Sequence, residues 1–91
     1  MRLRLVWSDQ ALQDIEAAMS RGHEYARAAR AVVEDMERFA ELGWTVGRLV
    51  RLRRGPARYF PVRPLGVFYQ VRVGELVVLE VVDARGLSTL P

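Results

Sequence analysis

Residues 57–83 read ARYFPVRPLGVFYQVRVGELVVLEVVD, and this stretch decides the fold. It alternates apolar and polar side chains, and two short breaks that contain glycine divide it. Such alternation between turn signals predicts antiparallel strands at 57–63, 67–73 and 76–83. The last run is almost continuously apolar, so we expect it to form a central strand that is covered on both faces. Pro61 lacks an amide donor, which predicts an edge or a bulge at that point.

Upstream of these strands the period changes from that of a strand to that of a helix. Residues 2–7 alternate like a strand with one buried face. Ser8 can cap a first helix, which we expect to end near Gly22. Its apolar stripe consists of Ala11, Leu12, Ile15, Ala18 and Met19. A second amphipathic helix should end near Gly43, and its stripe consists of Tyr25, Ala28, Ala29, Val32, Met36, Phe39 and Ala40.

These patterns together predict one α+β domain over residues 1–91, with the order β-α-α-β-β-β. The short connection between the helices makes them antiparallel neighbours, packed on a mainly antiparallel sheet. Residues 47–53 also alternate, and they suit either a further strand or an ordered connection. We expect the shared core to contain Ile15, Val32, Val78 and Leu79.

The charge of the chain is concentrated in one segment. All 14 basic residues are arginine, and the net charge is +3. Between Glu41 and Glu75 there is no acidic residue, and the arginines there are Arg48, Arg51, Arg53, Arg54, Arg58, Arg63 and Arg72. The remainder of the chain is slightly acidic. This asymmetry predicts a polyanion or an acidic protein as partner. In the alternative reading, the arginines only cover exposed strand faces with their aliphatic stems.

Composition excludes several classes of site. The chain has no cysteine and a single histidine, His23, so we expect neither a disulfide framework nor a thiol nucleophile nor a metal site. No cofactor is implied. No apolar run approaches the roughly 18 residues of a membrane helix, and the N-terminus does not read as a secretion signal. We therefore expect a cytoplasmic protein that does not contact a membrane.

Residues 58–85, from Arg58 to Arg85, resemble the closing hairpins of the RelE/ParE toxin superfamily, and the stretch WSDQALQDI at 7–15 resembles its opening. The resemblance implies the toxin of a bacterial type II toxin–antitoxin pair, with a cognate antitoxin that the charge predicts to be acidic. RelE-like members cleave messenger RNA in the ribosomal A site, whereas ParE-like members poison DNA gyrase. RelE-like cleavage is the first expectation. ParE-like inhibition, or a catalytically silent binding module on the same fold, is the alternative.

The resemblance also assigns roles to single residues. Arg85 fits the position after the last strand at which RelE-like toxins hold an active-site arginine, and Arg58 and Arg63 match a cationic strand and turn. Tyr69 matches a tyrosine that is usually structural. Gly66 departs from the pattern, because it stands where a RelE-like sequence has a catalytic arginine.

Two further departures lie at the C-terminal end. The stretch DARG at 83–86 replaces the more usual His-x-Arg-Arg, and the sequence ends at Pro91 without the tyrosine that several nucleases of the family use.

Metal-free RNA cleavage needs cations at the scissile phosphate and groups that move protons to and from the ribose oxygens. The arginines can supply the charge, and Tyr59 is the best candidate for proton transfer because it adjoins Arg58. The expected catalytic residues are Arg58, Arg63, Arg85 and Tyr59. The expected nucleic-acid-binding residues are Arg48, Arg51, Arg53, Arg54 and Arg72. A general nucleic-acid-binding domain outside the family is a third possibility.

Overall fold

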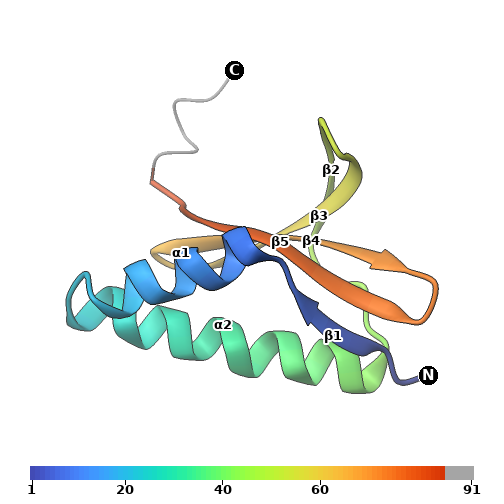
Figure 1. Ribbon diagram of the computed structural model, residues 1–91, viewed down its shortest axis with the longest axis horizontal. Coiled ribbons are helices and arrows are strands. Elements are labelled where there is room, and N and C mark those ends of the chain that lie inside the picture. Colours follow the sequence, from blue (N-terminus) through green and yellow to red (C-terminus); the bar gives the residue numbers. More distant parts are fainter. Residues whose placement is uncertain (86–91) are drawn as a thin grey trace.

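The computed structural model describes residues 1–85, in which two helices cover one face of a five-stranded sheet (Figure 1). The elements are β1 (Arg4–Trp7), α1 (Asp9–Met19), α2 (His23–Leu42), β2 (Arg48–Leu52), β3 (Gly55–Val62), β4 (Leu65–Arg72) and β5 (Glu75–Asp83). The strand order is β1-β5-β4-β3-β2, with β1 parallel to β5 and all other pairs antiparallel. The predicted α+β class is confirmed, and β2 forms as a strand.

Several predicted boundaries move by a few residues. β1 begins at Arg4, and α1 ends at Met19. Gly22 is instead the residue that precedes α2, with a φ of 119° that favours glycine. β3 begins at Gly55, two residues before the predicted start at 57, and Gly55 pairs with Leu52, so Arg53 and Arg54 form a two-residue hairpin turn. The prediction was wrong here because Gly and Pro mark turns and strand starts alike.

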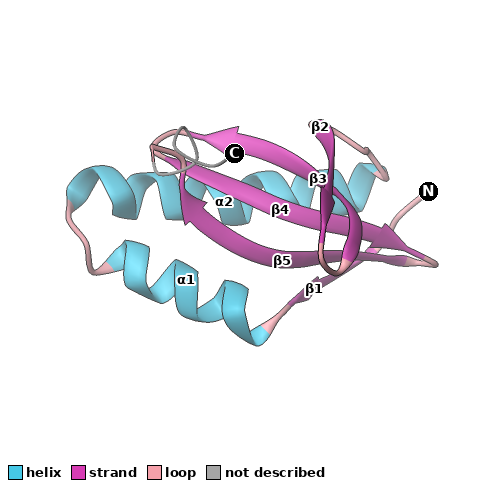
Figure 2. Cartoon of the chain, turned by 90° about the horizontal axis from the view of Figure 1, so that it is seen from above, coloured by secondary structure: helices cyan, strands magenta, loops and turns pink. Residues whose placement is uncertain are grey.

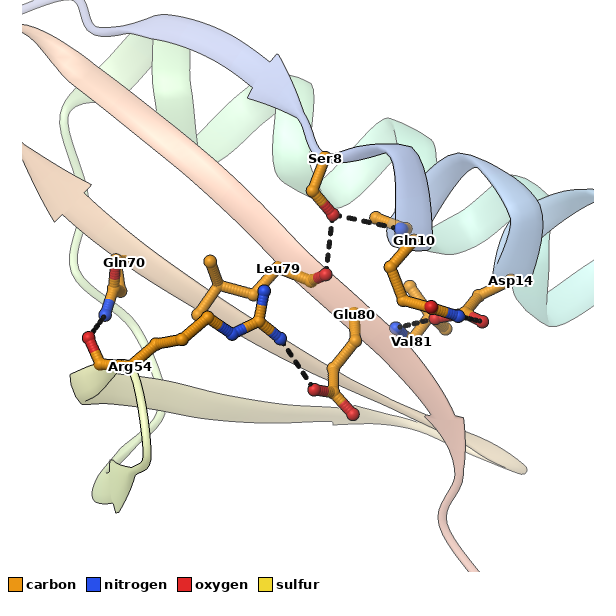
Figure 3. Close-up of polar contacts among 9 residues, drawn as sticks. Ser8, Gln10, Asp14, Arg54, Gln70, Leu79, Glu80 and Val81 are labelled. Atoms are coloured by element: carbon orange, nitrogen blue, oxygen red, sulfur yellow. Dashed lines mark hydrogen bonds and ion pairs between the residues drawn. The ribbon is translucent and has the colours of Figure 1, made fainter.

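Side chains of the first helix complete the hydrogen bonding of β5 beyond the end of β1 (Figure 3). The Ser8 hydroxyl accepts a hydrogen bond from the amide of Ala11 (3.0 Å), which caps α1, and donates one to the carbonyl of Leu79 (2.6 Å). Further along α1, the Asp14 carboxylate accepts a hydrogen bond from the amide of Val81 (2.9 Å). These contacts dock α1 against β5 and leave little of that strand's edge open to another chain.

The main core lies between the helices and the sheet. Val32, Met36, Tyr69 and Val78 are completely buried there, and the Tyr69 hydroxyl donates a hydrogen bond to the carbonyl of Val46. The structural role expected of Tyr69 is therefore confirmed. Within residues 1–85, neither α1 nor α2 combines the length and the apolar character that a helix needs to cross a membrane.

The apolar stripe predicted for the first helix was too wide. Leu12 is 49% exposed and Met19 is 43% exposed. Each follows a small buried alanine, Ala11 or Ala18, and is turned about 100° away from it around the helix axis. Alanines let α1 approach the sheet closely, so only a narrow stripe is buried.

A second apolar cluster covers the opposite face of the sheet. The β2–β3 hairpin curls over that face and crosses β4 and β5 (Figure 2). Val50 and Leu52 of β2 pack against a cluster of Ala57, Phe68, Val77 and Leu79. β5 is thus covered on both faces, as predicted. Pro61 lies where β3 has already lost its pairing with β2, so its missing amide faces an open edge.

Candidate functional site

An open pocket of about 500 Å³ lies where the β3–β4 turn and the end of β5 meet the start of α2. Three of the four residues predicted to be catalytic, Tyr59, Arg63 and Arg85, line this pocket. Pro61, Pro64 and Ala84 form its apolar wall, and Glu24 contributes an acid. The pocket thus combines cations, an aromatic ring and one carboxylate.

The fourth predicted residue, Arg58, is not part of this pocket. Neighbouring residues of a strand point to opposite faces of a sheet, so Arg58 and Tyr59 diverge. The Arg58 guanidinium donates a hydrogen bond to the carbonyl of Gly47 (3.2 Å) and lines a separate groove beside Tyr69. The structure therefore does not bring Arg58 and Tyr59 together in one pocket, and the alternation of the strand is the sequence signal for this separation.

The ring of Tyr59 is held between the sheet and an arginine. It packs at 5.0 Å from the ring of Phe68, and the Arg48 guanidinium lies 5.9 Å from its centroid. Burial raises the pKa of the Tyr59 phenol, and the charges of Arg48 and Arg63 offset this only in part. At neutral pH the phenol therefore keeps its proton, and it can donate a hydrogen bond but is a poor base.

Tyr59 also explains why position 66 is a glycine. A Cβ atom at Gly66 would overlap the phenol oxygen and Cε1 of Tyr59 and lie 2.7 Å from its Cζ. The space that a side chain at position 66 would take is filled by the Tyr59 ring. The arginine that the family resemblance predicts at this position is replaced by glycine and by an aromatic ring from the neighbouring strand.

Arg85 belongs to a polar network that the sequence did not reveal. Its guanidinium donates a hydrogen bond to the Tyr25 hydroxyl, which donates one to the Asp83 carboxylate (2.7 Å). Arg21 pairs with the same carboxylate (3.1 Å), and Glu24 lies 4.0 Å from Arg85. A buried tyrosine needs a partner for its hydroxyl, which was the one available signal.

The network changes the titration of both charged partners. The Tyr25 hydrogen bond lowers the pKa of Asp83, with help from the amide of Arg85. The same hydroxyl raises the pKa of Arg85 further above its ordinary range. The charge of Arg85 therefore faces the carboxylates of Asp83 and Glu24, and an incoming phosphate would compete with them.

The remaining predicted arginines lie away from the pocket. Arg48, Arg51 and Arg53 are exposed on the β2–β3 hairpin. Arg54 pairs with Glu80 (3.0 Å), and Arg72 donates hydrogen bonds to Gln70. Of these arginines, only Arg48 approaches the pocket residues, through its contact with Tyr59. Among residues 1–85, no cluster of three or more acids and histidines could hold a metal ion.

The architecture has a counterpart among solved structures. No protein-family model matches this sequence, and no curated protein matches it. A chain of the chromosomal ParDE TA system from P. aeruginosa superposes with a TM-score of 0.71 at 17% sequence identity, over 89% of this chain and 95% of that chain. This chain has a ParE-like fold. The predicted RelE/ParE resemblance is confirmed at the level of the fold.

The ParE-like fold places the pocket at the end of the sheet nearest the α1–α2 connection, and the arginine-rich hairpin on the face opposite the helices (Figure 2). The pocket can hold an anionic group between Arg63 and Arg85, against the Tyr59 ring. Within residues 1–85 it offers Tyr59 as a proton donor and Glu24 as a carboxylate. Gly86 and Pro91, on which two predicted departures from the family rest, lie outside the described residues.

Proposed function

We propose that this chain is the toxin of a bacterial type II toxin–antitoxin module and that an acidic antitoxin neutralises it. The observation that carries the proposal is the likeness to a chain of the ParDE TA system, which extends over 89% of this chain. The segment between Glu41 and Glu75 holds seven arginines and no acid, and such a surface favours an acidic partner.

For the mode of action, the geometry favours inhibition by binding, in the ParE-like manner, with DNA gyrase as target. Cleavage needs several groups converging on one phosphate. Arg58 lies on another face, Gly66 lacks the expected guanidinium, and Arg85 is engaged by Tyr25 and Asp83. A surface that only docks has no such requirement.

RelE-like cleavage of ribosome-bound messenger RNA is the second candidate. The observation that favours it is the shared pocket of Tyr59, Arg63 and Arg85. In this reaction the arginines would stabilise the phosphorane charge, and the protonated phenol of Tyr59 would donate to the leaving 5′-oxygen. The remaining requirement is a base for the 2′-hydroxyl, and Glu24 is the carboxylate that lines the pocket.

One experiment tests the module and its target together. The chain is expressed from an inducible promoter, alone and together with any small acidic protein that an adjacent gene encodes. Growth arrest that coexpression relieves supports the toxin. DNA supercoiling by purified gyrase and mapping of messenger RNA ends in a translating extract then separate the two targets. A chain that is expressed, folded and harmless would overturn the proposal.

A further inference from the structure

The outer edge of β2 stands open, in contrast to the edge of β5. Beyond β1, the backbone of β5 is paired with side chains of Ser8 and Asp14. Among residues 1–85, β2 pairs with β3 on one side and with no strand on the other. Figure 1 shows β2 projecting away from the helices. A row of backbone donors and acceptors is therefore available for pairing with another chain.

A groove with an apolar rim lies on the sheet face that Leu49 of β2 shares with residues of β3 and β4. It measures about 210 Å³, and its walls include Leu49, Val71, Tyr69 and Arg58. Leu49 is 64% exposed and Val71 is 41% exposed, although both lie on regular strands. Exposed apolar side chains that line a groove next to an open edge fit the side chain of an added strand.

The surroundings of the edge are cationic. Arg48, Arg51 and Arg53 are exposed on β2 and on the turn that follows it. Glu80 of β5 contacts the hairpin, and its carboxylate is paired with Arg54 (3.0 Å). The hairpin itself is fixed in place, because Gln70 donates hydrogen bonds to the carbonyls of Arg54 (3.3 Å) and Pro56 (2.9 Å). The edge is therefore a positioned surface with an uncompensated positive charge.

We propose that the β2 edge binds an extended acidic segment of a protein partner as an added strand. Its backbone pairs with Arg48–Leu52, an apolar side chain packs on Leu49 at the β2 wall of the groove, and its carboxylates meet Arg48 and Arg51. The proposal rests on the proposed function in that the antitoxin would supply this segment. It does not depend on which target the toxin inhibits.

The chemistry of the edge favours a peptide over a nucleic acid. Phosphates pair with arginines but supply no amide donors for the free carbonyls of a strand edge. Leu49 would stay exposed beside a phosphate backbone, whereas a peptide side chain covers it. Arginines that serve only to keep a strand edge from pairing would need no apolar groove beside them.

The test uses the full chain and a labelled peptide in which pairs of glutamates alternate with pairs of valines, so that each face of the strand carries both residue types. Fluorescence anisotropy measures its binding at low and high salt. Two control probes are the same peptide with all of its backbone amides N-methylated, which has no amide donors for pairing as a strand, and a single-stranded oligonucleotide. The variants Leu49→Ser and Arg51→Ala are compared with Leu12→Ser and Arg27→Ala, which alter exposed residues of the same types on the helices.

We expect peptide binding that weakens with salt and falls about tenfold in Leu49→Ser and in Arg51→Ala, with the helix variants unchanged. The N-methylated peptide should bind at least tenfold more weakly. Equal binding of both peptides, or absence of binding, would overturn the added strand. Tighter binding of the oligonucleotide that depends on Arg51 and not on Leu49 would assign the edge to nucleic acid. Growth arrest by the same variants is measured separately, so failure of the toxin proposal remains distinguishable.

Discussion

The phenol ring of Tyr59 lies over Gly66 on the neighbouring strand and fills the space that a side chain there would need. Gly66 has no positive φ, so nothing in its backbone requires glycine. The close contact with the Tyr59 ring is the reason why position 66 is a glycine. The observed orientation of the Tyr59 ring in the pocket is therefore possible only with glycine at position 66.

Gly66→Ala should destabilise the fold by about 1–3 kcal/mol, because the new methyl group forces the ring of Tyr59 out of its place. Tyr59→Ala in the same chain should remove most of that cost. Urea unfolding of the wild type, the two single variants and the double variant gives the coupling free energy directly. Additive effects would show that the ring does not constrain position 66.

The spacing of apolar residues along the sequence predicted the helices and strands, because each amphipathic stripe packs against one core. It could not predict the second cluster, in which Val50 and Leu52 meet Val77 and Leu79. That contact depends on the curl of the β2–β3 hairpin. The contacts of Arg54 with Glu80 and of Gln70 with the hairpin carbonyls, which join residues distant in the sequence, accompany this curl.

The candidate site was predictable in part for a similar reason. The resemblance pointed to Arg63 and Arg85, which line one pocket. The partners of Arg85 were not predictable, since Tyr25 and Asp83 stand 58 residues apart and meet only when α2 packs beside the end of β5. The order of residue types along a strand predicts which face each side chain lies on. The partner of a side chain in a tertiary contact, in contrast, depends on the completed fold.

Leu79→Ala should lower the free energy of unfolding by about 2–5 kcal/mol, because Leu79 is 2% exposed in the second cluster. Leu12→Ala should change it by less than about 0.5 kcal/mol, since Leu12 is half exposed. Denaturant titrations of both variants make the comparison. A large effect at Leu12 together with a small one at Leu79 would contradict the packing described for α1 and β5.

Asp14→Ala should cost about 1–3 kcal/mol, because it leaves the amide of Val81 without its acceptor beside the buried core. Asp14→Asn keeps an oxygen in the same place and should cost less. Gln10→Ala serves as the control, since Gln10 contacts only the exposed side of Asp14. Amide hydrogen exchange at Val81 should accelerate in Asp14→Ala alone. Unchanged exchange there would show that the carboxylate does not protect this amide.

Stability should depend on the charge of Asp83 at acid pH. Its pKa in the folded state is below the ordinary value of 3.8. The folded state therefore binds fewer protons, and the stabilisation is complete above the ordinary pKa and is lost as pH falls through the lowered one. Asp83→Asn should be less stable than the wild type at neutral pH, and the difference should shrink below about pH 4. A difference that grows on acidification would contradict this sign.

The final prediction separates cleavage from docking through Arg63 and Arg58. Arg63 lines the pocket and, among the contacts of residues 1–85, pairs with no carboxylate, so Arg63→Ala tests the pocket without disturbing the fold. Arg85→Ala is a poorer probe, because it also breaks the contacts with Tyr25 and Asp83. Arg58→Ala is the matched control on the other face.

If the pocket cleaves RNA, Arg63→Ala should lower the cleavage rate on the order of 10²-fold, while ribosome binding and the rate of Arg58→Ala change little. If the chain acts by docking, the wild type should produce no new messenger RNA ends, and arginine variants should change only affinity for the target and its salt dependence. Primer extension in a translating extract and supercoiling by gyrase provide the two measurements. Equal loss of cleavage in Arg58→Ala and Arg63→Ala would contradict the assignment of these side chains to separate faces, because a single reaction centre would then need both.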